Sequence, residues 1–129
     1  PSLHEKLHDF DVEATGLPLQ LTLFERLKAQ GRVSPVLDAR AVLEDPRGQL
    51  ECLCTHLGVP FMENMLRWPA GRRHTDGIWA PYWYANVEKS TGFQAYVPKK
   101  RVIPEHLRGV FDEAMQLYQT LYRHRLDVS

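Results

Sequence analysis

The sequence predicts a mostly α-helical chain with one short strand near residues 35–38, and two observations lead to that fold class. Apolar residues recur every three or four positions along much of the 129-residue chain, which is the spacing of one helix face. A single short apolar run, Pro35-Val36-Leu37, is typical of a buried strand, and Asp38 follows where that strand would emerge. Start and stop signals then divide the chain into elements.

The clearest of these signals lie within residues 36–61. Asp45 is a favourable N-cap and Pro46 suits the first position of a helix. Gly58 supplies the left-handed residue that ends a helix, and Pro60 prevents the helix from resuming. The helix between them is predicted to carry one apolar stripe at i, i+3, i+4 and i+7, formed by Leu50, Leu53, Cys54 and Leu57.

Two longer helices are predicted on either side of this segment. Residues 19–30 repeat leucine at positions 19, 23 and 27 with Phe24 on the same side, and Gly31 ends the helix. Lys28 and Arg32 fall at its C-terminal end, where cations complement the helix dipole. A terminal helix is predicted at residues 104–126, beginning at Pro104.

Composition argues against several classes of protein. The chain has 16 Lys and Arg residues and 16 Asp and Glu residues, so nothing in its formal charge of zero suggests a nucleic-acid or acidic-membrane partner. It has neither a membrane-length apolar run nor a signal-peptide pattern, which predicts a cytoplasmic location. Cys52 and Cys54 are too close on one helix to bridge readily, so we expect no disulfide framework.

One short match to a metal motif lies near the start of the sequence. Residues 4–8 read His-Glu-Lys-Leu-His, the H-E-x-x-H pattern that places two zinc-binding imidazoles one helical turn apart. Two observations argue against a zinc site. Lys6 adds a cation to the turn that would face the metal, and no third ligand is identified, although Glu13 and Glu25 are carboxylates further along the sequence. We therefore expect a solvated helix face and no metal, and zinc chemistry stays a minor alternative.

A long segment at residues 67–81 differs in character from the helices. All three tryptophans fall between residues 68 and 83, around the basic triplet Arg72-Arg73-His74. Guanidinium groups pair with phosphate or sulfate oxygens, and aromatic rings stack on a purine or cover a pocket. This composition indicates the lid or rim of a ligand site. In the alternative reading, the aromatic side chains hold the loop against the core and the arginines are solvated.

The order of signals in residues 36–61 resembles a late segment of the sulfotransferase family. In that family a strand leads to a run that stands here as Ala41-Val42-Leu43-Glu44-Asp45-Pro46 and continues to Leu57-Gly58-Val59-Pro60-Phe61. The run is a packing motif. The resemblance implies that residues 1–129 form one partial domain, the C-terminal part of a three-layer α/β P-loop-like fold. The phosphosulfate loop and the catalytic base are then expected in a first half outside these residues.

The resemblance also implies a function. The family transfers a sulfuryl group from 3′-phosphoadenosine 5′-phosphosulfate to an alcohol or amine, and this portion would supply a nucleotide lid and walls of the small-molecule acceptor pocket. We expect no catalytic residue here, no activity from these residues alone, and dependence on the missing half of the chain or on another copy. The alternative is a non-catalytic helical domain that binds a protein partner.

Residues at three places in the sequence are expected to contact the nucleotide by the same resemblance. Ser2 falls at about the place of a serine that touches the 3′-phosphate. A second 3′-phosphate motif has two candidates: Gly71-Arg72-Arg73 with Trp79, which we prefer, and the basic run Lys99-Lys100-Arg101.

Overall fold

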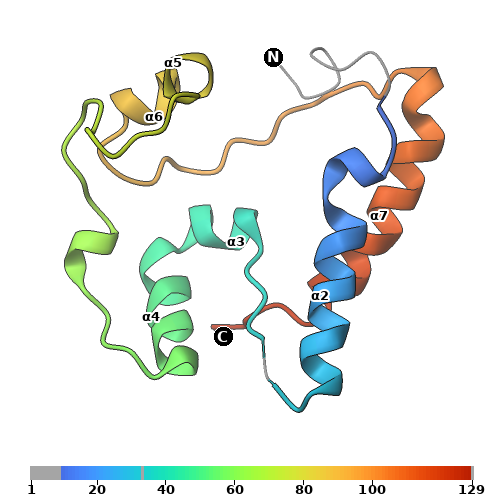
Figure 1. The fold of residues 1–129 in the computed structure, drawn as a ribbon, viewed down its shortest axis with the longest axis horizontal. Coiled ribbons are helices and arrows are strands. Elements are labelled where there is room, and N and C mark those ends of the chain that lie inside the picture. Colours follow the sequence, from blue (N-terminus) through green and yellow to red (C-terminus); the bar gives the residue numbers. More distant parts are fainter. Residues whose placement is uncertain (1–9, 33, 129) are drawn as a thin grey trace. The chain divides into compact units, whose positions relative to one another are not determined.

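The computed structural model describes residues 10–32 and 34–128, which form two compact units (Figure 1). Unit 1 comprises Pro1–Val36 and Pro98–Arg125, and unit 2 comprises Leu37–Val97 and Leu126–Ser129. Each unit therefore combines stretches that are far apart in the sequence. The organisation of the chain as one partial domain stays a prediction.

Unit 1 is built on two helices, α2 (Leu17–Ala29) and α7 (Arg108–Tyr122), which contact each other and run in the same direction (Figure 1). A short 3₁₀ turn precedes each of them, η1 (Glu13–Thr15) and η3 (Glu105–Leu107). The terminal helix is thus shorter than the predicted 104–126. Its inner stripe ends at the buried Leu121 and also contains three half-buried residues, Val110, Ala114 and Leu117.

The covered face of α2 differs from the predicted one. Leu19 is 62% exposed and Leu23 is 47% exposed, so the predicted stripe is wrong at those two positions. The helix carries leucines on more than one face, and the half-buried stripe runs through Leu17, Leu21 and Phe24. The predicted stop is confirmed, because Gly31 adopts a left-handed φ of 71° just after the helix ends.

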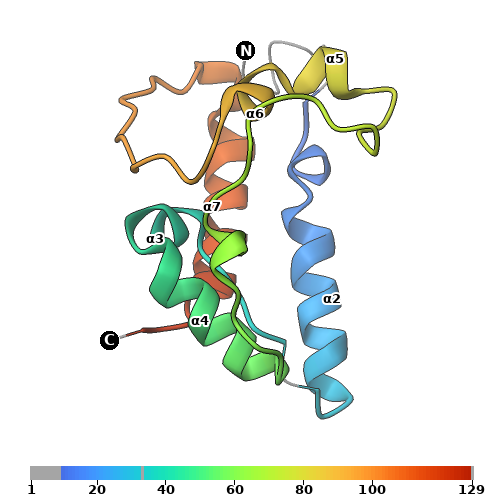
Figure 2. The same ribbon diagram turned by 90° about the vertical axis from the view of Figure 1, so that its left-hand side faces the viewer.

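Unit 2 contains α3 (Ala39–Glu44) packed beside α4 (Pro46–Leu57), as Figure 2 shows. Asp38 caps α3 by accepting a hydrogen bond from the Ala41 N–H (3.1 Å), and Asp45 caps α4 by accepting from the Gly48 N–H (3.0 Å). Gly58 ends α4 with a φ of 66°. The predicted caps of α4 are therefore confirmed. Three short helices follow: η2 (Glu63–Met65), α5 (Ala80–Trp83) and α6 (Ala85–Lys89).

The apolar stripe of α4 is covered along most of its length. Leu50 and Cys54 are buried, and the Cys54 Sγ lies 3.9 Å from the Met65 Sδ. Leu53 is half-buried, whereas Leu57, in the last turn, is exposed. The prediction holds for the first three members of the stripe and is wrong for the fourth.

The predicted strand near residues 35–38 is wrong, although the mostly helical class is confirmed. In the described part of the chain, Val36 forms one isolated parallel bridge with Arg125, and Arg67 forms one isolated antiparallel bridge with Gly92. A strand needs a partner along its length to pair its N–H and C=O groups. Val36 meets such a partner at a single position, so the apolar run does not become a strand.

The length and apolar character of the helices bear on membrane insertion. Within residues 10–32 and 34–128, none combines the length and the apolar character that a membrane crossing requires.

The cap of α4 yields a first testable expectation. Asp45→Ala removes the acceptor for the Gly48 N–H and should lower the free energy of unfolding by about 1 kcal/mol. Asp45→Asn keeps a side-chain oxygen and should stay close to the wild type. Urea denaturation followed by circular dichroism measures both variants. Equal losses in the two would show that the cap is not what Asp45 contributes.

Candidate functional site

The aromatic-basic loop, residues 67–81, is closed at its base by backbone hydrogen bonds within unit 2. Beyond the bridge between Arg67 and Gly92, the Trp68 N–H donates to the Thr91 C=O (3.0 Å). The Gly71 N–H donates to the Glu88 C=O (2.7 Å). The start of the loop is therefore tied to residues 88–92, at the end of α6.

Trp68 anchors this base through its side chain. Its indole N–H donates to the Ser90 Oγ (2.9 Å), and the Ser90 hydroxyl donates to the Val87 C=O (2.7 Å). The Trp68 ring meets Phe93 edge to face, with centroids 5.4 Å apart. For Trp68, then, the alternative reading from the sequence is the right one, because this tryptophan holds the loop in place.

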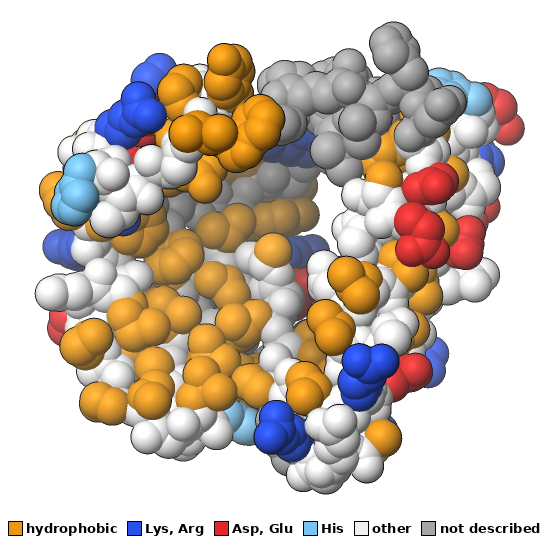
Figure 3. Space-filling model, viewed as in Figure 1, with side chains coloured by type: hydrophobic (Ala, Val, Ile, Leu, Met, Phe, Trp, Pro, Cys, Tyr) orange, Lys and Arg blue, Asp and Glu red, His pale blue; other side chains and the backbone are white. Residues whose placement is uncertain are grey.

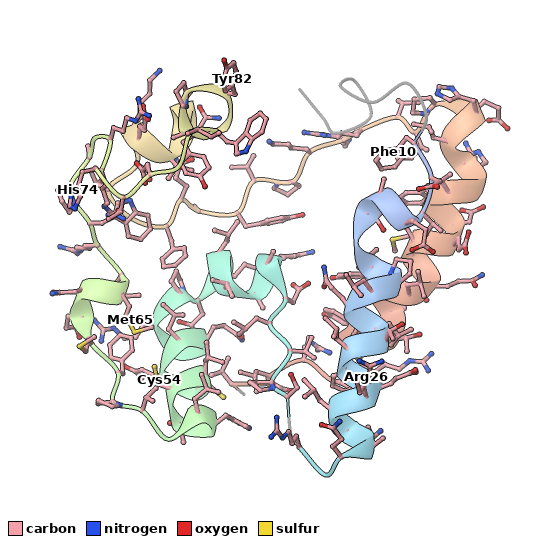
Figure 4. The ribbon with its side chains drawn as sticks, in the orientation of Figure 1. Phe10, Arg26, Cys54, Met65, His74 and Tyr82 are labelled. Atoms are coloured by element: carbon pink, nitrogen blue, oxygen red, sulfur yellow. The ribbon has the colours of Figure 1, made fainter. Side chains whose placement is uncertain are left out.

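The tip of the loop is ordered by Asp76 and exposes its basic side chains. The Asp76 carboxylate accepts a hydrogen bond from the Arg73 N–H (2.8 Å), and the Asp76 N–H donates to the Arg73 C=O (3.0 Å). The side chains of Arg72, Arg73 and His74 are exposed, and that of His74 points away from the ribbon in Figure 4. Neither arginine forms an ion pair with any residue that the structure describes. Two guanidinium groups are thus open to an anion.

Exposed apolar side chains follow the basic tip of the loop in the sequence. Ile78 is 81% exposed, Trp79 is 64% exposed and Tyr82 is 74% exposed, and the rings of Trp79 and Tyr82 lie 6.2 Å apart. Figure 3 shows apolar side chains gathered beside Lys and Arg side chains where the loop and α5 lie. Clustered exposed apolar residues are typical of binding surfaces.

A hollow of about 740 Å³ lies at the base of the loop. Trp68 and Phe93 form an aromatic wall, and Gly92 brings the backbone close, since an added Cβ would lie 3.0 Å from the Leu66 C=O. The volume falls in the range of small-molecule sites. The other lining residues are Pro46, Arg47, Leu66, Arg67, Pro69 and Thr91.

Arg47, one of the two arginines that line this hollow, is paired with carboxylates of the protein. The Arg47 guanidinium donates to both carboxylate oxygens of Glu63 (2.6 and 2.7 Å) and lies near Glu51 (3.4 Å). The hydrogen bond and the charge of Glu63 raise the pKa of Arg47, and the hydrogen bond from Arg47 lowers the pKa of Glu63. Arg67 makes no ion pair with a described residue, although its charge also helps to lower the pKa of Glu63, and it is the less engaged of the two cations at the hollow.

The Arg47–Glu63 pair predicts a pH-dependent contribution to stability. Because the folded pKa of Glu63 is lowered, the contribution is complete well above the unfolded value of about 4.3 and is lost as the pH falls through the folded value. Glu63→Gln should therefore be less stable than the wild type at about pH 7, and the difference in stability should shrink as the pH falls below about 4. Urea midpoints across that range measure the gap, which should be small because both side chains are exposed. A gap that does not close in acid would contradict the assignment.

The predicted nucleotide contacts fall in different parts of the molecule. Arg72, Arg73 and Trp79 lie on one loop of unit 2, whereas Lys99 and Lys100 are exposed in unit 1, on the extended segment before η3. The two basic candidates remain separate alternatives. Ser2 lies outside the described residues.

The zinc alternative also stays a prediction, because its central motif is not described by the structure. The H-E-x-x-H match at residues 4–8 lies outside the described residues, and Glu13 and Glu25 are exposed. Within the described ranges, no three His, Cys, Asp or Glu residues form a group that could hold a metal ion.

Sequence reasoning included residues 67–69 of the hollow in the predicted ligand-site rim, but it missed the other residues that line the hollow. Arg47 occupies an ordinary position in a helix, so it does not stand out in the sequence. The segment Ser90-Thr91-Gly92-Phe93 carries only a turn signal. The pairing of Arg67 with Gly92 joins residues far apart in the sequence, which no local pattern indicates.

Comparison with known proteins identifies the family. Two curated proteins of Arabidopsis thaliana are similar, branched-chain-amino-acid aminotransferase-like protein 1 (36% identical over 122 residues) and protein 2 (32% over 120 residues). Each alignment covers 93% of this chain and 22% of the relative, so the chain spans about a fifth of their length. No solved structure gives a significant match. The model of the sulfotransferase domain matches residues 4–124, nearly the whole chain, and the protein therefore belongs to the sulfotransferase domain family.

Proposed function

We propose that this chain is the C-terminal part of a sulfotransferase domain with a three-layer α/β P-loop-like fold. The domain transfers a sulfuryl group from 3′-phosphoadenosine 5′-phosphosulfate to a hydroxyl or amine of a small molecule. The observation that carries the proposal is the exposure of Arg72 and Arg73 on the same loop as Trp79, a loop whose base is fixed. The family match supports the reaction class.

The names of the relatives bear on a different class of reaction. Both Arabidopsis proteins are called aminotransferase-like, but this chain aligns with only 22% of each. The sulfotransferase match covers residues 4–124 themselves. We therefore assign sulfuryl transfer, rather than amino transfer, to this part of the polypeptide.

The residues of the loop suit both nucleotides of the reaction, the donor 3′-phosphoadenosine 5′-phosphosulfate and the product adenosine 3′,5′-bisphosphate. A 3′-phosphate offers several oxygens to the paired guanidinium groups of Arg72 and Arg73, which can bind it in the bidentate manner. The exposed ring of Trp79 can stack on the adenine or cover it. These residues bind and orient the nucleotide, while we place the phosphosulfate loop and the catalytic base outside this chain.

The hollow at the base of the loop suits an acceptor. Trp68 and Phe93 provide an apolar wall, Thr91 provides a hydroxyl, and Arg67 provides a cation at the rim. Because Trp68 is held by Ser90, this wall is fixed before a ligand arrives. We assign to it one side of the acceptor pocket in a cytoplasmic enzyme that needs neither nucleic acid nor membrane.

The test is a calorimetric titration of adenosine 3′,5′-bisphosphate into the full-length protein, repeated with residues 1–129 alone. We expect binding by the full-length protein, little binding by residues 1–129, and sulfuryl transfer by the former only. A full-length protein that does not bind the nucleotide would refute the proposed function.

A second candidate function rests on the exposed apolar residues Ile78, Trp79 and Tyr82. In a non-catalytic helical interaction domain, these side chains would be the anchors of a protein interface. Trp79→Ala with Tyr82→Ala separates the two functions. Loss of nucleotide affinity favours the enzyme, whereas unchanged nucleotide affinity with loss of a protein complex favours the interaction domain.

A further inference from the structure

A second hollow lies in unit 1, beside the ends of α2 and α7, which are the lower ends of both helices in Figure 1. Its volume is about 330 Å³, at the lower end of the range for small-molecule sites. It is lined by Phe24 and Lys28 of α2, by Gly31, Arg32 and Ser34 of the following connection, and by His124 after α7.

The lining is basic. Lys28 and Arg32 are exposed side chains, and neither forms an ion pair with a residue that the structure describes. No carboxylate is among the described residues that line the hollow. Among the described residues that line the hollow, none therefore neutralises this positive charge.

Backbone hydrogen bonds already cap two of the last carbonyls of α2. The Gly31 N–H donates to the Lys28 C=O (3.0 Å), and the Arg32 N–H donates to the Leu27 C=O (2.9 Å). At the end of α7, the His124 N–H donates to the Leu121 C=O (2.9 Å). With these backbone caps in place, the side chains of Lys28 and Arg32 are not needed to satisfy the carbonyls.

The hollow also has an aromatic wall and an open side. The rings of Phe24 and His124 lie 4.8 Å apart and are tilted by 39°. Gly31 has a φ of 71°, and, apart from its neighbours in the chain, no described residue lies within 4 Å of the position that a Cβ would take. An anionic group can enter beside the backbone there, with Ser34 contributing a hydroxyl donor.

We propose that this hollow binds the phosphate or sulfate group of a small organic molecule. Lys28 and Arg32 pair with the oxyanion, and the body of the molecule lies against Phe24 and His124. A tetrahedral oxyanion alone fills only part of the volume, which is why an ester fits the site better than the free ion. The site uses none of the residues of the aromatic-basic loop, so it adds to the proposed function.

The probes are phenyl phosphate and inorganic phosphate, titrated calorimetrically into the full-length protein against sodium chloride at equal ionic strength. Phenyl phosphate should bind more tightly than inorganic phosphate. Lys28→Ala with Arg32→Ala should weaken its binding at least about tenfold, the usual effect of losing a hydrogen bond to a charged group. Arg26→Ala with Arg123→Ala is the matched control, because these exposed cations lie on the same stretches and do not line the hollow.

Three results would overturn the proposal. The first is a phenyl phosphate titration that gives no more heat than sodium chloride. The second is an equal loss of phenyl phosphate affinity in the control variant. The third is loss of phenyl phosphate binding in Arg72→Ala with Arg73→Ala, which would place the anion on the loop. Lys28→Gln with Arg32→Gln, checked by its melting temperature, removes the charges while keeping long polar side chains, so the same tenfold loss in that variant supports the site without a folding defect.

Discussion

Arg72→Ala together with Arg73→Ala will weaken the binding of adenosine 3′,5′-bisphosphate to the full-length protein by about a hundredfold. Each guanidinium that leaves a phosphate takes with it a hydrogen bond between charged groups, about 1.5 kcal/mol or more, and two such losses give about 3 kcal/mol. Stability should hardly change, because both side chains are exposed and form no ion pair with a described residue. Calorimetric titration measures the affinity, and a thermal melt measures the stability.

Two parallel variants make this result specific. Arg26→Ala with Arg123→Ala removes the same charge from unit 1 and should leave nucleotide affinity within about twofold of the wild type, since neither side chain belongs to the aromatic-basic loop. Lys99→Ala with Lys100→Ala tests the other basic candidate. A hundredfold loss in the lysine variant with none in the Arg72 and Arg73 variant would move the phosphate contact to residues 99–100.

Leu121→Ala will lower the free energy of unfolding by about 2–5 kcal/mol, the usual cost of a large-to-small change in a core. Leu121 is buried near the end of α7, the helix that packs on α2 in unit 1. Alanine leaves a cavity that the surrounding residues cannot fill without shifting. Urea denaturation of the full-length protein, followed by fluorescence and circular dichroism, gives the difference.

The matched control for this core change is Leu19→Ala, on the same pair of helices. Leu19 is 62% exposed, so its truncation should change stability by no more than about 0.5 kcal/mol. Similar losses in the two variants would mean that the packing of α7 on α2 does not stabilise unit 1. A large loss for Leu19→Ala alone would show that the face of α2 predicted from sequence is the buried one.

The elements that sequence predicts well are those whose cause is local. Asp45 meets the Gly48 N–H three residues away, and Gly58 ends α4 without help from elsewhere. At these positions the residue type alone predicts the local backbone geometry, because aspartate favours an N-cap and glycine favours a left-handed helix end.

The elements that sequence predicts poorly depend on distant partners. Val36 meets only Arg125, so an apolar run that suits a strand forms one bridge. Which leucine stripe of α2 is covered depends on α7, and the role of Trp68 depends on Ser90, 22 residues further on. Local periodicity leaves each of these choices open, because it describes one element at a time.

The closed base of the aromatic-basic loop separates stability from recognition. Trp68 and Gly71 hold the start of the loop through partners at residues 88–91, while residues 72–79 mostly project into solvent. Substitutions in that outer stretch leave the anchoring bonds intact, so selection on ligand preference could act there with little penalty to folding. The arrangement makes the loop an interchangeable module. Chimeras that exchange residues 72–79 between members of the family should fold alike and differ in what they bind.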